Sequence, residues 1–406
     1  MYKKLDVNEI KLRERFIKDM NLPIGIYESP YFEYYIELYE PLFNSLTKWN
    51  ELRELIDNSF NGNPVLFLEE YYYVKEAMLN DIKQSDAYKE YNTMDMNTFS
   101  IASSPFANTP SSNIYKETND GKLFVSFDLS KANFQVMKYA NIIDGNLSWD
   151  DYVEKYTRLD YIKNSKYTRQ VVFGNLNPKR QVSLEKFIIN EILKVVDMEL
   201  KQEEYGTKFK LVSLANDEFV YEFDGTKYEL ERALYKRYST GKRIFDFSRI
   251  PIEVSVKSFK LELLQYKTYN ERKVTSYLKR YLDHTIEIKE CSKYYFAQVY
   301  KDLMGMQVVR DDLVFLMEGQ ISFFEYPLQR VRKEEEDETN LFSNTIVLLG
   351  TDEKEKFNYC IGTKDEKTYL MVFERLENNG NGKLISYKPL KHIVEIGQWR
   401  LNVTEG

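Results

Sequence analysis

The sequence predicts an α+β protein in three parts: a helical N-terminal region, a sheet packed with helices, and a C-terminal extension ending in a small β domain. Three patterns support this prediction. Apolar residues recur at three- and four-residue spacing through residues 1–95, which is the helical period. Strand-like and helix-like patterns follow one another through residues 121–262. Residues 341–399 hold about five short strand patterns separated by turn residues.

The composition limits the chemistry that the chain can perform. Its 406 residues suffice for two or three domains, and its net charge of −7 argues against a basic coat for nucleic acid but allows a local basic channel. The two cysteines, Cys291 and Cys360, speak against a disulfide framework. The two histidines, His284 and His392, leave little material for a histidine-based triad or metal site. An enzyme built from this chain would use carboxylates, Lys, Arg and Tyr.

No targeting or membrane segment is visible in the sequence. The first residues lack the apolar stretch of a signal peptide, and no run approaches the ~18 apolar residues that a membrane helix needs. The frequent Tyr, Lys and Asn are typical of an AT-rich genome. We therefore expect a cytoplasmic protein with no membrane partner, from a bacterium or from a phage in its host.

The first catalytic candidate lies where a strand meets a helix. Alternating apolar residues from Val125 to Leu129 predict a strand, and the apolar spacing of residues 134–140 predicts a helix. Asp128 lies at the junction, where it either caps the helix or takes part in chemistry. The preceding residues 96–120 are rich in Ser, Asn, Pro and Thr, which predicts a long irregular segment.

The clearest basic segment spans residues 161–184, which contain no Asp or Glu. Its cations either contact phosphate groups or only keep a helix soluble. They are Lys163, Lys166, Arg169, Lys179 and Arg180.

Two adjacent acids then interrupt an apolar pattern. Residues 184–201 predict a long amphipathic helix, and residues 206–230 predict a β-hairpin with Asn216, Asp217 and Glu218 at its tip. A short helix and a strand over 250–261 follow. Beyond them we expect a helical stretch over 271–315 and a charged linker over 330–340.

Two carboxylates from separate elements, with cations nearby, suit phosphoryl transfer assisted by two Mg²⁺ (or Mn²⁺) ions. Such ions bridge protein carboxylates and substrate phosphates, while Arg or Lys neutralises the charge of a triphosphate. Asp128 and Asp217 are the expected metal ligands, and Glu218 supports them. The alternative is that the hairpin acids are ordinary surface charges.

These segments, in this order, resemble the palm domain of family A nucleic-acid polymerases, the group of bacterial DNA polymerase I and phage DNA polymerases. "SFDLSKANFQVMKYA" and "LVSLANDEFVYEF" resemble the two carboxylate motifs. The resemblance implies that Asp128 and Asp217 hold the catalytic metals beside Glu218. "SKYTRQVVFGNLN" resembles the fingers helix, which implies that Arg169 binds the incoming triphosphate and that Phe173 lies beside the nucleobase.

The chain departs from the family pattern at several positions. Asn216 replaces the usual His, and Ser165 stands where a basic residue is usual, with Lys166 beside it as a substitute. Asn133 and Asn177 stand where DNA polymerases of the family have the Glu and Tyr that screen the sugar. The choice between DNA and RNA therefore stays open. The stretch between the fingers motif and the second carboxylate motif is short, which implies reduced fingers.

The resemblance also implies a role for each part of the chain. Residues 1–120 would be a reduced thumb-like region, and residues 121–262 the catalytic palm with a short fingers segment over 161–183. Residues 263–335 would form a helical extension, and residues 341–406 a small β-rich domain.

The implied function is template-dependent nucleotidyl transfer in DNA replication, with a DNA or RNA primer–template and nucleoside triphosphates as partners. One alternative is a catalytically weak or inactive relative that binds nucleic acid or serves as a subunit of a replication or transcription complex. Another is a structural or interaction protein. The residues expected to contact nucleic acid are Lys163, Lys179, Arg180 and Gln181.

Overall fold

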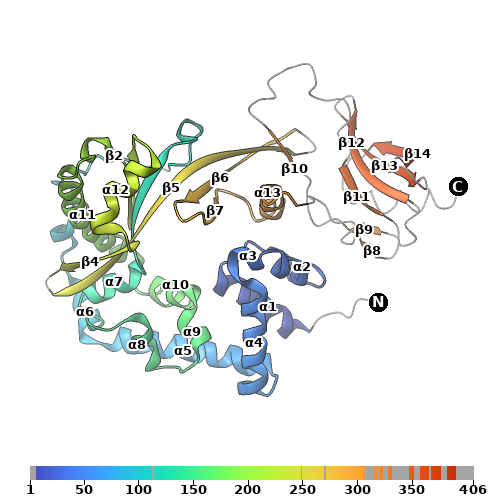
Figure 1. The fold of residues 1–406 in the computed structure, drawn as a ribbon. Coiled ribbons are helices and arrows are strands. Elements are labelled where there is room, and N and C mark those ends of the chain that lie inside the picture. Colours follow the sequence, from blue (N-terminus) through green and yellow to red (C-terminus); the bar gives the residue numbers. More distant parts are fainter. Residues whose placement is uncertain are drawn as a thin grey trace. The chain divides into compact units, whose positions relative to one another are not determined.

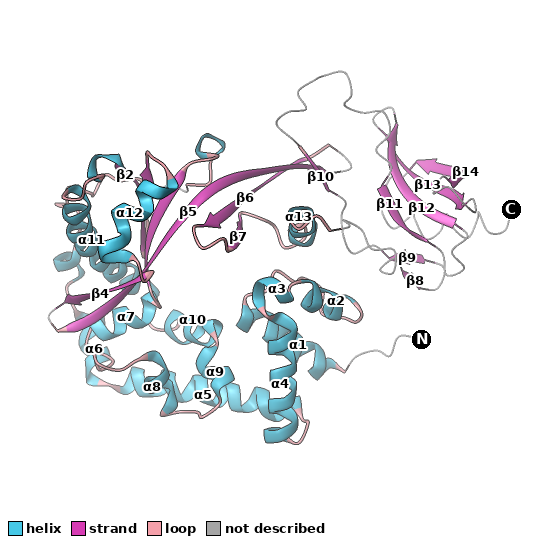
Figure 2. Cartoon of the chain, in the orientation of Figure 1, coloured by secondary structure: helices cyan, strands magenta, loops and turns pink. Residues whose placement is uncertain are grey.

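A computed structural model describes residues 6–111, 114–247, 249–268 and 271–306, and shorter stretches beyond them. Those stretches are 315–317, 320–322, 328–331, 347–351, 357–364, 367–375 and 382–389. The described residues form an α+β fold with an eight-stranded antiparallel sheet (Figures 1 and 2). The chain divides into two compact units, and all candidate site residues belong to the first. That unit comprises Met1–Leu22, Tyr27–Glu262 and Leu278–Glu287.

The N-terminal region is helical over its described residues from 6 onward, as predicted for residues 1–95. Short 3₁₀ turns at Met96–Phe99 and Glu117–Asn119 are the regular elements described in the segment expected to be irregular. The helices are α1 Val7–Met20, α2 Tyr31–Leu38, α3 Glu40–Phe43, α4 Ser45–Phe60, α5 Pro64–Gln84 and α6 Asp86–Thr93.

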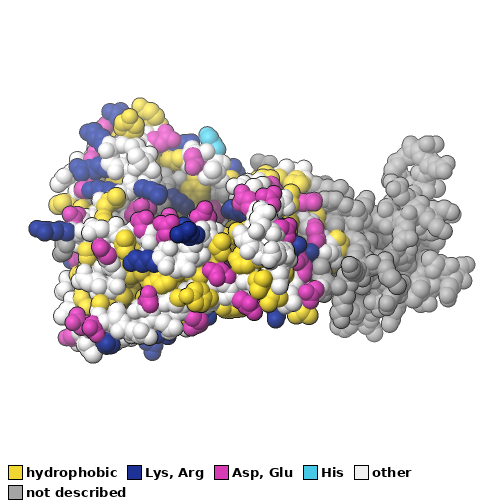
Figure 3. All heavy atoms as spheres, turned by 90° about the horizontal axis from the view of Figure 1, so that it is seen from below, with side chains coloured by type: hydrophobic (Ala, Val, Ile, Leu, Met, Phe, Trp, Pro, Cys, Tyr) yellow, Lys and Arg dark blue, Asp and Glu magenta, His cyan; other side chains and the backbone are white. Residues whose placement is uncertain are grey.

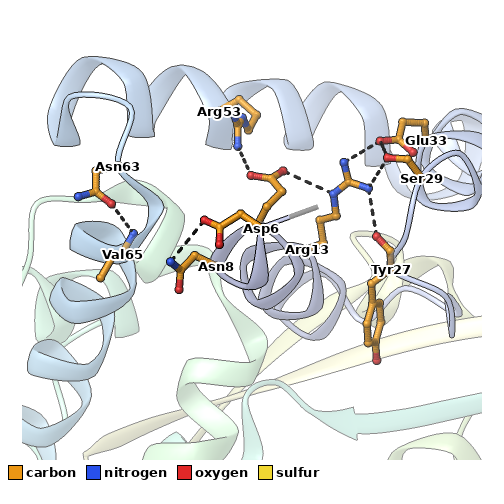
Figure 4. A network of polar contacts seen from close by, with 10 residues as sticks. Asp6, Asn8, Arg13, Tyr27, Ser29, Glu33, Arg53, Asn63 and Val65 are labelled. Carbon is orange, nitrogen blue, oxygen red and sulfur yellow. Dashed lines mark hydrogen bonds and ion pairs between the residues drawn. The ribbon is translucent and has the colours of Figure 1, made fainter. Parts of the chain in front are cut away.

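A buried guanidinium fixes α1 against the segment that leads into α2 (Figure 4). Arg13 donates to the main-chain oxygen of Tyr27 at 3.0 Å and to the Ser29 hydroxyl at 3.1 Å. It also forms an ion pair with Glu33 at 2.7 Å. Because a buried cation without partners is costly, these contacts define how the first helices pack.

The strand β1, Leu123–Leu129, lies at the centre of the sheet. It pairs with β3, Glu218–Phe223, on one side and with β5, Ile250–Thr268, on the other. The strand β2, Phe209–Leu214, forms a hairpin with β3, as predicted. The remaining strands of this sheet are β4 Lys242–Phe247, β6 Lys273–Tyr281, β7 Ile286–Lys289 and β10 Leu328–Arg330.

The two faces of β1 differ in what they contact. Val125, Phe127 and Leu129 join the main hydrophobic core, and the Phe127 ring stacks on that of Phe219 with centroids 4.8 Å apart. Alternation along the strand directs Asp128 to the opposite face. The helices that contribute to the core include α7 Ala132–Tyr139, α10 Lys166–Gly174, α11 Pro178–Lys201 and α12 Lys227–Tyr238. Helices α8 Trp149–Glu154 and α9 Asp160–Asn164 connect α7 to α10.

The expected helical stretch over 271–315, and with it a helical extension over 263–335, is wrong. Residues 273–281 and 286–289 are strands, and in this stretch the described residues form one helix, α13 Phe296–Leu303. The sequence of β6 contains Val274, Thr275 and Tyr277, which favour a pleated strand. Its pairing with β5 decides the outcome.

The C-terminal region contains strands, as predicted. An antiparallel four-stranded sheet comprises β11 Val347–Thr351, β12 Phe357–Lys364, β13 Lys367–Arg375 and β14 Gly382–Pro389. A two-stranded pair, β8 Phe315–Met317 and β9 Gln320–Ser322, precedes it. Most of the expected charged linker, residues 332–340, lies outside the described residues. No helix among the described residues has the length and apolarity needed to cross a membrane.

Candidate active site

Three acidic residues lie near one another at one end of the central strands. Asp128 on β1 is the direct cross-strand partner of Glu218 on β3, so their side chains leave the same face of the sheet. The main-chain N–H of Leu129 donates to the main-chain oxygen of Asp217 at 2.8 Å, which holds the hairpin tip against the end of β1. The main-chain N–H of Ala215 donates to the main-chain oxygen of Glu218 at 2.7 Å, so the hairpin turns through Asn216 and Asp217.

Asp128 does not cap the helix that follows it. Helix α7 begins at Ala132, its N-cap residue is Lys131, and no side chain caps it. Lys131 has φ 56°, in the left-handed region, which lets the chain turn sharply from the strand into the helix. The Asp128 carboxylate is therefore left for another role.

The neighbouring acids change the titration of Asp128. Desolvation is the largest cause that raises its pKa, the charges of Asp217 and Glu218 add to it, and together they bring the pKa to about 7. Lys257 and Lys166 act in the opposite direction. Although nearby protein atoms reduce the solvation of its carboxylate, Asp128 remains exposed, so solvent and ligands can reach it. The local excess of negative charge favours cation binding.

Two lysines provide the positive charge near Asp128. Lys257 lies on β5, in register with Ser126 and two residues from the partner of Asp128, and its side chain is exposed. Lys166 is the first residue of α10 and is also exposed. The Ser165 hydroxyl caps this helix by accepting from the N–H of Thr168 at 3.0 Å. Lys166 was expected to bind substrate, and its charge acts on Asp128.

A fourth carboxylate, missed by the sequence analysis, lies on α11. Glu185 is 7% exposed, and burial together with the charge of Asp217 raises its pKa to about 7. It lies one turn after the buried Gln181. An acid within the apolar stripe formed by Leu184 and Ile188 was the signal that could have revealed it.

Arg169 is packed on an aromatic ring in this structure. Its guanidinium lies 5.7 Å from the centroid of the Trp149 ring, and the side chain is half-buried. Burial lowers its pKa, and the nearby Asp150 opposes that change. Asp128 is not among the charges that act on Arg169. The expected triphosphate ligand is therefore held by a cation–π contact, and it has no ion-pair partner among the described residues.

Phe173 does not lie beside an open nucleobase site. Its side chain is completely buried, and its ring contacts those of Trp149 and Phe134 at centroid distances of 5.8 and 6.4 Å. The resemblance assigned this ring to the incoming base, but here it forms part of the core. It shares the buried side of α10 with Thr168 and Val172.

Gln181 and Asn133 form an internal hydrogen-bond network. The Gln181 amide donates to the main-chain oxygens of Phe173 and Leu176 at 2.6 and 2.7 Å, which satisfies the end of α10. Asn133 donates to the Gln181 side-chain oxygen at 3.3 Å. Gln181 is 2% exposed, so the expectation that it touches a primer–template junction is wrong for this conformation.

Most of the other basic candidates also have internal partners. Lys163 pairs with Asp160 and Glu154 at 3.4 and 3.5 Å. Arg180 donates to two main-chain oxygens of the N-terminal region, and Lys179 is exposed. Basic and acidic side chains are interspersed on the face drawn in Figure 3. The basic segment is thus partly structural.

The donor set suits a hard divalent cation. Mg²⁺ is usually held by one or two carboxylates, with waters and substrate phosphates as the other ligands. Asp128 and Asp217 match this pattern. Within the part of the chain that the structure describes, no group of three or more His, Cys, Asp and Glu side chains is close enough to hold a metal by itself.

Comparison with protein-family models, with curated proteins and with solved structures finds no match to this chain.

Proposed function

We propose that this chain is a palm-type nucleotidyltransferase that adds nucleotides to a 3′-OH on a nucleic-acid primer–template. The observation that carries the proposal is the meeting of Asp128, Asp217 and Glu218 at one end of the β3–β1–β5 sheet, with α11 and α12 contributing to the core behind it. The order of these elements is that of the polymerase palm that the sequence resembles.

Asp128 and Asp217 would hold the metal ions, which supply Lewis acidity toward the 3′-oxygen and the phosphate oxygens. Glu218 adds negative charge beside them. Lys166 and Lys257 lie where they can neutralise a triphosphate near Asp128. In this arrangement Lys166 takes the role that the resemblance gave to Arg169.

Primer extension tests the proposal. The full chain receives a labelled primer–template, Mg²⁺ or Mn²⁺, and either deoxynucleoside or ribonucleoside triphosphates. Extension that is lost in both Asp128→Asn and Asp217→Asn supports the assignment and reveals the sugar preference. Folded protein without extension under any of these conditions contradicts it.

A second candidate is a polymerase-like palm that binds nucleic acid without catalysis, as a subunit of a replication or transcription complex. The burial of Phe173 and the packing of Arg169 on Trp149 favour it, because neither side chain is available to an incoming nucleotide. Binding of a labelled primer–template without extension distinguishes this candidate from the first.

A further inference from the structure

A pocket of about 660 Å³ opens beside the acidic cluster, within the first unit. Its walls are α12, the turn that leads into β4, the middle of β5, and the turn between β6 and β7. This volume is in the range of small-molecule sites.

The pocket arises where two strands meet the same edge of β5. The N–H of Val256 donates to the Gly241 oxygen at 2.8 Å, and the N–H of Leu282 donates to the Ser258 oxygen at 3.2 Å. The main-chain N–H and C=O groups of Val256 and Ser258 point to the same edge of β5. The turn before β4 and the end of β6 therefore bind neighbouring positions on this edge, and the pocket lies where they meet. Gly241 makes this turn with φ +69°, which favours glycine.

Lys257 connects the pocket to the candidate active site. Its ammonium lies 5.4 Å from the centroid of the Tyr281 ring inside the pocket, and Lys257 is the cross-strand partner of Ser126, which lies two residues before Asp128 on the same face of β1. The pocket therefore adjoins the carboxylates through one shared side chain.

Aromatic and hydroxyl groups line the rest of the pocket. Tyr235 on α12 is 71% exposed, so one face of its ring is open to a ligand. Tyr281 and Thr285 lie on the facing turn. Exposed aromatic rings beside a cation are typical of sites where unpaired bases stack.

The charge of the pocket limits the ligand. Lys257 is its one cationic lining residue, while Glu231 and Asp283 are acidic. Both acids have partners: Glu231 pairs with Lys227 at 3.8 Å, and the Asp283 carboxylate accepts from the main-chain N–H and the hydroxyl of Thr285 at 3.0 and 2.6 Å. Lys257 can then balance the single charge of a phosphodiester, whereas a triphosphate would bring several charges to one lysine.

We propose that this pocket binds one unpaired nucleotide of a single nucleic-acid strand, with its base on Tyr235 and its phosphodiester near Lys257. The proposal rests on the proposed function, because it takes the ligand to be the same nucleic acid. It adds a holding point for the strand outside the site of nucleotidyl transfer.

Binding of a fluorescently labelled single-stranded oligothymidylate to the full chain, followed by anisotropy, tests this proposal. Tyr235→Ala should weaken binding about ten-fold through the lost stacking, whereas Tyr235→Phe should bind like the wild type. The matched control is Tyr73→Ala, since Tyr73 is a similarly exposed tyrosine, 66% exposed on α5, outside the pocket. Photo-cross-linking with a thiothymidine oligonucleotide should label peptides containing Tyr235 or Tyr281.

Absence of wild-type binding, equal binding by Tyr235→Ala, or cross-links confined to other regions would overturn the pocket assignment. Primer extension separates the two proposals. Strand binding that depends on Tyr235 in a protein without extension keeps the pocket and contradicts the catalytic function. Extension by a protein whose strand binding is insensitive to Tyr235→Ala does the reverse.

Discussion

Asp128 and Glu218 face one another across adjacent antiparallel strands. The main-chain oxygen of Asp217, in the hairpin turn next to Glu218, accepts a hydrogen bond from the main-chain N–H of Leu129. This arrangement brings acidic residues from two distant parts of the chain to the same end of the central strands. Desolvation is the main reason that the pKa of Asp128 is raised, and repulsion from the charges of Asp217 and Glu218 adds to the rise. A fold that keeps such a cluster has a use for it or a counterion to neutralise it.

The first prediction concerns the two expected metal ligands. Asp128→Asn and Asp217→Asn should each reduce primer extension at least about 100-fold, since changes even to groups that only support metal ligands cost 10–100-fold. Circular dichroism should show both variants folded.

The matched control for these variants is Glu222→Gln on the same strand. Glu222 pairs with Lys122 at 2.9 Å and lies four residues along β3 from Glu218. Its loss should leave extension near the wild-type rate. Equal losses in all three variants would indicate a general structural effect and contradict the specific role of the aspartates.

The second prediction compares Lys166 with the nearby Lys163, which forms ion pairs with two acidic residues. Lys166→Ala should raise the KM for nucleoside triphosphate about ten-fold or more, because a charge-assisted contact near Asp128 is lost. Lys163→Ala should change KM little, since Lys163 pairs with Asp160 and Glu154. Steady-state kinetics of both variants decide the point, and the opposite order of effects would contradict the assignment.

The hairpin and the strand that it joins could be predicted because they leave local patterns. Alternation from Val125 to Leu129 and the apolar stretches around residues 216–218 each follow the two-residue period of a strand. The position of the acids then follows from register. The pairing of Asp128 with Glu218 is a consequence of those local patterns once the strands are adjacent.

Other features depended on contacts that no local pattern reveals. Residues 273–281 form the strand β6 and not a helix because pairing with β5 decides their conformation. Glu185 and Gln181 lie on an amphipathic helix, where a polar residue is first assumed to face solvent, yet both are buried. The burial of Phe173 follows from its packing on Trp149, which the resemblance to a fingers helix did not include.

The third prediction tests the burial of Phe173. Phe173→Ala should lower the free energy of unfolding by about 3–5 kcal/mol, because it leaves a cavity beside Trp149 and Phe134. Urea denaturation measures this change. A variant with unchanged stability but a raised KM for nucleotide would instead place the ring at the incoming base.

The fourth prediction concerns the pH dependence of stability that Glu185 contributes. Its pKa is about 7 in the folded protein and close to 4.5 when the chain is unfolded, so the folded state binds the proton more tightly. This contribution is fully present below about pH 4 and is lost as the pH rises through 7. Glu185→Gln mimics the protonated form, so the variant should gain up to about 3 kcal/mol over the wild type at pH 8, and little at pH 4.

Thermal unfolding of the wild type and of Glu185→Gln between pH 4 and pH 8, without divalent cations, measures this difference. Glu191→Gln on the same helix is the matched control, because Glu191 pairs with Lys194 at 2.6 Å near the surface. A difference in melting temperature that stays constant with pH would contradict a raised pKa at Glu185. Because Asp217 contributes to that pKa, Asp217→Asn should also reduce the effect of Glu185→Gln, which links the buried acid on α11 to the hairpin.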